Sequence, residues 1–213
     1  MGLLKVYQQL FDQIQQEEMR NYFLGLGKKG MLKEYEADEI VELSRDNLAI
    51  VIEGCLKQSL YSRSGSEKTL YFLQYGEILG EMDYFSCGKN EIMSYALERS
   101  IIAVMDRKVM EEELQKNPLA YKYFMHSITR KFRIVMLQMT GLVFNDSLGK
   151  LAEVLLRLSS QVGLEVEEGI MINFTLTHEE MASLIGCSRA TVTKGLNKLK
   201  DADLIKIVNK KKG

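Results

Sequence analysis

The feature that most constrains this chain lies near its C-terminus, where a tight turn at residues 186–188 joins two short amphipathic patterns. Thr177 is followed three residues later by Glu180, which is the capping-box signature of a helix start. Gly186 ends that helix where a positive φ is needed, and Ser188 is a suitable N-cap for the next one. The apolar side of the second helix is formed by Val192, Leu196 and Leu199. A short helix, a glycine turn and a second helix together predict a helix-turn-helix.

The second helix of this motif is expected to present a polar and partly basic face to solvent. That face consists of Arg189, Ala190, Thr193, Lys194, Asn197 and Lys198. The major groove of DNA admits one α-helix, and arginine and lysine suit the O6 and N7 acceptors of guanine. Ala190 and the methyl group of Thr193 can pack on thymine. The hydroxyl groups of Thr177, Ser188 and Thr191 lie at or near helix starts, where hydroxyls and free N–H groups bind phosphate.

The charge of the chain is concentrated in the same region. Residues 188–213 contain eight basic and two acidic residues, a net charge of +6, although the whole chain carries only −1. A basic end on an acidic body favours an anionic partner held at one pole. The alternative is an ordinary helical hairpin with a solvated basic face, but the turn geometry, the hydroxyls at the helix starts and the local charge of +6 together favour DNA binding. We therefore expect double-stranded DNA as the partner.

Composition excludes several other classes of protein. With 213 residues, 46% hydrophobic and 27% charged, the chain can build an ordinary core and is not expected to be disordered. No run approaches the roughly 18 apolar residues that suggest a membrane span, and the N-terminus turns polar too soon for a secretory signal. Three widely spaced cysteines form no disulfide framework, which favours a reducing compartment. We expect a cytoplasmic protein without membrane segments.

Upstream of the helix-turn-helix, the spacing of apolar residues and glycines changes twice. Residues 1–30 show apolar residues near helical spacing. From residue 31 to about residue 106, short runs of Ile, Val, Leu, Tyr and Phe alternate with glycines, which is typical of an antiparallel β module. The segment that begins at Asn47, NLAIVIEGCLKQSLYSRSGSEKTLYFL, predicts a strand, a glycine turn, a strand, a Ser-Gly hairpin and a strand. A short helix is expected over RKVMEEELQK.

A long helix is expected to begin after Asn117-Pro118 and meets no further Gly or Pro until Gly141. Its apolar residues alternate at spacings of four and three over about three heptads. They are Tyr121, Met125, Ile128, Phe132, Val135, Met139 and Leu142. The flanking positions include Lys122, Arg130, Lys131 and Arg133. This narrow stripe between polar flanks predicts a helix–helix dimer seam rather than a plain core helix, and so a homodimer.

Several motifs together resemble those of the CRP/FNR family of transcription factors. They are IVIEGCLKQ, SRSGSEKTL, LQYGEILGE, the long helix and LTHEEMASLIGCSRATVTKGLNKLKDADLI. The resemblance implies an α+β fold with an N-terminal antiparallel β-roll (a cyclic-nucleotide-binding-like jelly roll), a dimerisation helix and a C-terminal winged helix-turn-helix. The implied domains are 1–117 for effector sensing, 118–143 for dimerisation and 144–213 for DNA binding.

The resemblance also implies roles for individual residues. Those expected to face bases are Arg189, Ala190, Thr193 and Lys194, and those expected to hold phosphates are Thr177, His178, Ser188 and Thr191. The implied effector pocket contains Gly80, Glu81, Glu91, Lys131, Phe132, Val135 and Met136. Half-sites of the expected inverted repeat would lie about one helical turn apart.

The chain departs from the family pattern at informative places. Glu91-Ile92 stands where the cyclic-nucleotide branch has Arg-Ser, and a carboxylate there would repel a phosphate. Val135 and Met136 replace the polar residues which that branch uses on adenine. We therefore expect that cAMP is not the effector; an uncharged or weakly polar ligand is preferred, and a pocket filled by the protein's own side chains is the alternative. Ala190 stands where the family usually has glutamate, so the base read there should differ.

Other functions fit the sequence less well. A cupin-like metal-dependent enzyme would need clustered histidine and carboxylate ligands, but the two histidines are His126, on the long helix, and His178. The hypothesis of an effector module that does not bind DNA does not explain the basic face of the second helix. Cys55 and Cys87 are expected to be ordinary small residues, with a redox role as the alternative. We expect no catalytic activity, metal or cofactor, and RNA polymerase as a further partner if the protein activates transcription.

Overall fold

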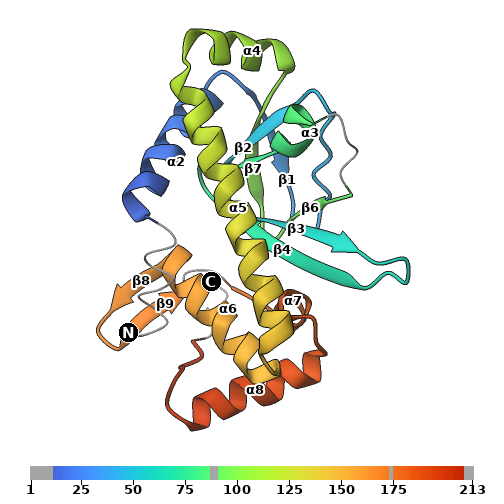
Figure 1. The fold of residues 1–213 in the computed structure, drawn as a ribbon, viewed down its shortest axis with the longest axis vertical. Coiled ribbons are helices and arrows are strands. Elements are labelled where there is room, and N and C mark those ends of the chain that lie inside the picture. Colours follow the sequence, from blue (N-terminus) through green and yellow to red (C-terminus); the bar gives the residue numbers. More distant parts are fainter. Residues whose placement is uncertain (1–11, 87–90, 173–174, 209–213) are drawn as a thin grey trace. The chain divides into compact units, whose positions relative to one another are not determined.

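The computed structural model describes residues 12–86, 91–172 and 175–208 (Figure 1). The chain divides into two compact units, Gln13–Val135 and a second that includes Met136–Gly213. The boundary between them falls within one continuous helix, α5 (Leu119–Phe144), which passes through Gly141 without a break.

The first unit is built on an antiparallel β-roll, as the glycine-punctuated sequence predicts. Its strands are β1 (Met31–Tyr35), β2 (Leu48–Glu53), β3 (Leu56–Tyr61), β4 (Glu67–Leu73), β5 (Ile78–Leu79), β6 (Met93–Ala96) and β7 (Ser100–Met105). One sheet has the order β1-β7-β2-β5, and the other has the order β4-β3-β6. All pairings are antiparallel. The expected N-terminal β module is therefore confirmed.

The turn between β2 and β3 shows why glycine is required at one of these positions. Gly54 has a φ of 84°, in the left-handed region. A Cβ added there would also collide with the side chain of Ser100 and with the backbone carbonyl of Arg99. The Ser100 hydroxyl fills the space beneath this turn and accepts a hydrogen bond from the Cys55 N–H at 3.2 Å.

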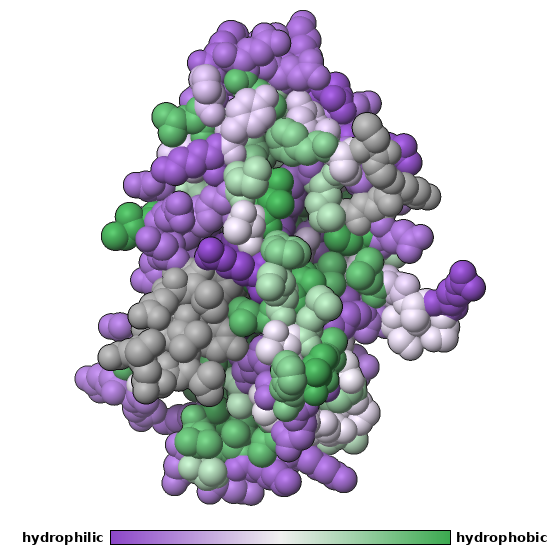
Figure 2. Space-filling view, viewed as in Figure 1, coloured by the Kyte–Doolittle hydropathy of each residue, from purple (hydrophilic) through white to green (hydrophobic). Residues whose placement is uncertain are grey.

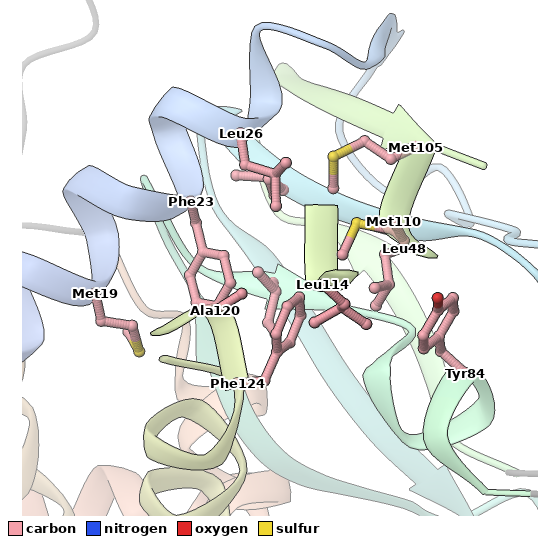
Figure 3. Packing of buried hydrophobic residues seen from close by; sticks show 12 residues of the cluster. Met19, Phe23, Leu26, Leu48, Tyr84, Met105, Met110, Leu114, Ala120 and Phe124 are labelled. Carbon is pink, nitrogen blue, oxygen red and sulfur yellow. The ribbon is translucent and has the colours of Figure 1, made fainter. Parts of the chain in front are cut away.

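Four helices complete the core of the first unit. They are α2 (Gln13–Gly27), α3 (Glu81–Phe85), α4 (Arg107–Lys116) and the first turns of α5. Asp106 caps α4 by accepting the N–H of Val109 at 2.9 Å. Figure 3 shows side chains from all four helices meeting those of β2 and β7 in one apolar cluster. Phe23 of α2 and Phe124 of α5 meet edge to face there, with ring centres 5.1 Å apart.

Two of the polar positions that flank the apolar stripe of α5 are buried, and one of them, Lys131, was expected to line the effector pocket. Arg130 and Lys131 are only 6% and 5% exposed. Each is buried against a carboxylate of the roll: Arg130 Nη1 lies 2.9 Å from Glu77, and Lys131 Nζ lies 2.5 Å from Glu81. A buried charge is tolerated when it is paired and hydrogen-bonded, and both cations satisfy that condition. The α5 helix therefore attaches to the roll through ion pairs as well as apolar side chains.

The second unit contains the helix-turn-helix. Its elements are the C-terminal part of α5, α6 (Ser147–Val162), β8 (Gly163–Val166), β9 (Gly169–Ile172), α7 (His178–Ile185) and α8 (Arg189–Asp201). Gly195 lets α8 approach α6 closely, because a Cβ there would lie 2.8 Å from the side chain of Leu151. The apolar side chains of Val192, Leu196 and Leu199 are buried, as predicted.

The hairpin of this unit, β8–β9, is antiparallel and precedes the helix-turn-helix. The described residues that follow α8, 202–208, contain no strand. The end of the chain, where a wing would be completed, lies outside the described residues. In the described part of the chain, no helix is both long and apolar enough to cross a membrane.

Candidate nucleic-acid interface

The start of α7 is held by the predicted capping box. The Thr177 hydroxyl accepts the Glu180 N–H at 3.2 Å, and the Glu180 carboxylate accepts the Thr177 N–H at 2.6 Å. The same hydroxyl donates its proton to the Glu180 carboxylate at 2.8 Å. The Thr177 hydroxyl must therefore turn away from Glu180 before it can donate to a phosphate.

The turn between α7 and α8 has the geometry that its sequence requires. Gly186 adopts a left-handed conformation with a φ of 65°, and the Cys187 N–H returns to the Ala182 carbonyl at 3.1 Å. Ser188 then caps α8 by accepting the N–H of Thr191 at 3.2 Å. The hydroxyls of Ser188 and Thr191 lie 2.9 Å apart and share one proton, so the other hydroxyl proton is left to donate. This N-terminal end of α8 can thus offer a donor to an anion.

The outer face of α8 carries positive charge without protein partners. Five of the residues predicted for that face are exposed: Arg189, Ala190, Lys194, Asn197 and Lys198. Within the described residues, Arg189, Lys194 and Lys198 form no ion pair. Thr193, the sixth, is half-buried. Unpaired cations on one helix face are suited to an external anion, as DNA supplies.

His178 and Thr193 are joined across the two helices. Nδ1 of His178 lies 2.9 Å from the Thr193 hydroxyl, which itself donates to the Arg189 carbonyl at 3.0 Å. The sequence predicts a phosphate contact for His178 and a position on the base-reading face for Thr193. The structure brings the two predicted groups of residues together at this point.

The residues predicted for the effector pocket fall into two groups. Gly80, with a φ of 91°, leads into α3, so that the neighbouring Glu81 is only 2% exposed. Lys131 bonds both the Glu81 carboxylate and the Ile78 carbonyl, the latter at 2.7 Å, and lies 5.4 Å from the centre of the Tyr71 ring. Burial, together with the charge of Glu81, raises the pKa of the Tyr71 phenol. Gly80, Glu81 and Lys131 are thus gathered in one place.

The other predicted pocket residues are not buried with them. Phe132 and Met136 are 62% and 50% exposed on α5, Val135 is half-buried, and Glu91 is exposed. Successive positions of the helix have different surroundings, because Lys131 points to the roll and Phe132 to solvent.

Glu77 is a structural residue that the sequence analysis did not single out. It is 2% exposed and accepts from Arg130 at 2.9 Å, from Arg20 of α2 at 3.2 Å and from the Gln74 N–H at 3.1 Å. Burial raises the pKa of a carboxyl, but here Arg130, Arg20, the hydrogen bond from the Gln74 N–H and Lys131 together outweigh burial and lower the pKa of Glu77. The sequence feature that could have identified Glu77 is a carboxylate directly before an apolar strand, because a carboxylate buried with such a strand needs a cation near it.

One stripe along α5 is apolar and exposed in the described part of the chain. Tyr121, Met125, Phe132, Met139 and Leu142 are between 45% and 63% exposed. The two remaining residues of the predicted seam, Ile128 and Val135, are half-buried. Figure 2 shows apolar side chains gathered along this helix. A stripe of large apolar side chains in water is unfavourable and marks an interaction surface.

The alternative of a metal-dependent enzyme requires a cluster of ligand side chains, which can be sought in the described residues. There, no three side chains of His, Cys, Asp or Glu come together in a group that can hold a metal ion. Cys55 is buried at the start of β3 with 3% exposure, and Cys87 lies outside the described residues. No observation in this part of the chain favours the metal-dependent enzyme.

Comparison with known protein families assigns both units. Residues 32–117 match the model of the cyclic nucleotide-binding domain, and residues 149–212 match that of the Crp-like helix-turn-helix domain. The first match covers the roll with α4, and the second covers α6, the hairpin and both helices of the motif.

Individual proteins show the same similarity. The chain is 27% identical over 151 residues to a CRP-like cAMP-activated global transcriptional regulator of Mycobacterium tuberculosis, covering 71% of this chain and 67% of that protein. It is 26% identical over 166 residues to the anaerobic regulatory protein of Bacillus subtilis, covering 78% and 70%. Among solved structures, a CooA variant from Carboxydothermus hydrogenoformans superposes with a TM-score of 0.73 at 25% identity, covering 87% of this chain and 83% of that one.

Proposed function

The chain belongs to the CRP/FNR family of transcriptional regulators, and from this premise we propose that it works as a homodimer that reads an inverted repeat in DNA. Each protomer supplies one α8 helix to a major groove, and a small effector acts on the β-roll. A two-fold dimer of this kind reads half-sites about one helical turn apart, roughly 34 Å.

One observation carries the DNA-binding part of this proposal: the outer face of α8 holds Arg189 and Lys194 exposed and without ion pairs in the described chain. The helix is stiffened at its N-terminal end by the Ser188 cap, so these side chains start from a defined backbone. We assign base contacts to Arg189, Ala190, Thr193 and Lys194. We assign phosphate contacts to Thr177, His178, Ser188 and Thr191, which set position rather than sequence.

The test is a selection from a random duplex library, followed by fluorescence anisotropy on the selected site and on a scrambled duplex. Lys194→Ala should weaken binding to the selected site more than to the scrambled one, since a base contact carries sequence preference. Lys116→Ala, which removes an exposed lysine of α4, is the matched control and should leave both affinities unchanged. Equal loss on both duplexes for Lys194→Ala would show a phosphate contact instead.

The dimer part of the proposal is supported by the uncovered apolar stripe on α5. Phe132, 62% exposed on that stripe, would face its counterpart in a parallel helix pair. Phe132→Glu places like charges at the seam and should shift sedimentation from dimer to monomer. Lys122→Glu adds the same charge at an exposed position of α5 off the seam and should stay dimeric. A dimeric Phe132→Glu variant at low concentration would refute this seam.

We further propose that the effector is not cAMP. Glu81 is already engaged by Lys131 at 2.5 Å, and Glu91 offers a carboxylate where a phosphate would need a cation. Calorimetry with millimolar cAMP should therefore give no saturable heat, and micromolar binding would refute the proposal. If the protein activates transcription, RNA polymerase is the further partner, and a reconstituted transcription assay measures this.

A further inference from the structure

The hydrogen bonds at Thr193 carry information about where one proton sits on His178. The Thr193 hydroxyl has a single proton, and it lies within hydrogen-bond distance of both the Arg189 carbonyl, at 3.0 Å, and His178 Nδ1, at 2.9 Å. A carbonyl oxygen can only accept, so satisfying that bond uses the Thr193 proton. The bond to His178 is then satisfied only if Nδ1 carries a hydrogen and donates it to the hydroxyl oxygen.

When the proton of a neutral histidine is held on Nδ1, the other ring nitrogen, Nε2, differs in hydrogen bonding between the neutral and the charged ring. In the neutral ring, Nε2 then carries a lone pair and cannot donate to an anion. When the ring is protonated, Nε2 becomes a donor with positive charge behind it, which makes a strong hydrogen bond to a phosphate oxygen. The contact is therefore switched on by a proton.

We propose that His178 is a proton-dependent phosphate contact and that Thr193 is the positioning residue that fixes its tautomer. This inference rests on the proposed DNA binding and deepens it: affinity for DNA should rise as the pH falls through the range in which imidazole titrates. Thr193 acts through His178, while its methyl group stays available to the groove.

Other ionisable groups on the packed elements share this environment. On α7 they are Glu179 and Glu180, of which Glu180 is committed to the capping box. On α8 they are Arg189, Lys194, Lys198, Lys200 and Asp201. On α6, which packs on both helices, they are Lys150, Glu153 and Arg157. Carboxyl, arginine and lysine side chains in general keep their charge between about pH 6 and about pH 8, and imidazole is the side chain whose ordinary range of protonation falls in this window.

The experiment compares DNA affinity at about pH 6 and about pH 8, at constant ionic strength, on the selected duplex. The wild type should bind about tenfold more tightly at the lower pH, since each dimer gains two charged contacts. His178→Gln should lose this dependence, and His126→Gln, which changes the other histidine, should keep it. An unchanged pH response in His178→Gln would overturn the inference.

Thr193 is tested by two further variants. Thr193→Val removes the acceptor for Nδ1–H, so the neutral ring can place its proton on Nε2 and donate without charge; the pH dependence should shrink to a few-fold. Thr193→Ser keeps the hydroxyl and should restore the wild-type response. A purely structural role for Thr193 would lower affinity at both pH values equally, and that result would overturn the assignment of Thr193.

A measurement without DNA separates this inference from the proposed function. Nitrogen-15 NMR of the free protein at about pH 8 should show the Nδ1–H tautomer for the signal that His178→Gln removes. An Nε2–H tautomer would overturn the inference while leaving DNA binding intact. Failure to bind any duplex at either pH would overturn the proposed function and this inference with it.

Discussion

Two regions of the molecule use the same kind of side chain in opposite ways. In the β-roll unit, Arg130 and Lys131 are buried, and each lies within 2.9 Å of a carboxylate. On α8, Arg189 and Lys194 are exposed, and neither forms an ion pair in the described chain. Where the protein supplies the counter-charge, the cation fixes structure; where it does not, the cation is available to a partner. Residue type alone does not distinguish these cases.

The largest effect should come from breaking a buried pair. Arg130→Met leaves Glu77 buried, and Arg20, whose side chain is 25% exposed, is then its remaining ion-pair partner among the described residues. We expect a loss of about 3–5 kcal/mol in the free energy of unfolding. Urea denaturation at fixed protein concentration measures it, with Lys122→Met, an exposed position on α5, as the control that should change little. A loss in the free energy of unfolding below about 1 kcal/mol would contradict the claim that the buried cation fixes structure.

The same pair predicts how the first unit responds to acid. The pKa of Glu77 is lowered in the folded protein, so its contribution is present at neutral pH and is lost as the pH falls through the folded-state value. Stability should therefore decline below about pH 4, by no more than Arg130→Met costs. Glu77→Gln should flatten this part of the stability curve, and thermal melts across the acid range check it. An identical acid response in the variant would assign the loss to other carboxylates.

The unpaired cations should behave differently. Arg189→Ala removes a side chain with no protein partner in the described residues, so the melting temperature should stay the same. Binding to the selected duplex should weaken by about 1–3 kcal/mol, with preference lost at one symmetric base pair. Anisotropy across single-base variants of the duplex measures both effects. If Arg189→Ala lowers the melting temperature as Arg130→Met does, the distinction between the two regions fails.

The smallest effect concerns the backbone that presents these cations. Gly186 has a φ of 65°, and an added Cβ would meet only Leu142, at a comfortable 3.7 Å. Gly186→Ala should therefore cost about 1 kcal/mol through left-handed strain and not through a clash. A thermal melt of the variant measures the cost, and Gly65→Ala in the β3–β4 hairpin, where φ is 83° and the space is also open, is its counterpart in the first unit.

The sequence predicts the elements of this fold well because local patterns specify them. The capping box at Thr177, the left-handed Gly186 and the α4 span were all expected from neighbouring residues. The pairing of Arg130 with Glu77 was not, because Glu77 lies about 50 positions earlier in the chain. Lys131 and Glu81 were placed together only through the family resemblance. A charge on a helix flank is normally solvated, and only the fold brings the carboxylates to it.

The candidate site shows the same division. Exposure of Arg189, Lys194 and Lys198 follows from helical periodicity and was predicted. The hydrogen bond between His178 and Thr193 joins two helices across 15 positions, and it depends on how α7 and α8 pack. Likewise, the effector residues predicted together are divided between the interior of the roll and the exposed side of α5.

Because α5 contributes to the core of the roll, the roll cannot complete its core during synthesis until α5 has been made. Ala120 and Phe124 complete the cluster begun by Met19 and Phe23, and Arg130 supplies the counter-charge for Glu77. Domains tend to fold in order from the N-terminus as they are made. A nascent chain that ends at Lys116 contains every strand of the roll. It still lacks Phe124, the last aromatic side chain of the core, and Arg130, the buried cation that pairs with Glu77. We expect the ribosome-bound roll to resist protease only after residues beyond Lys131 have left the exit tunnel.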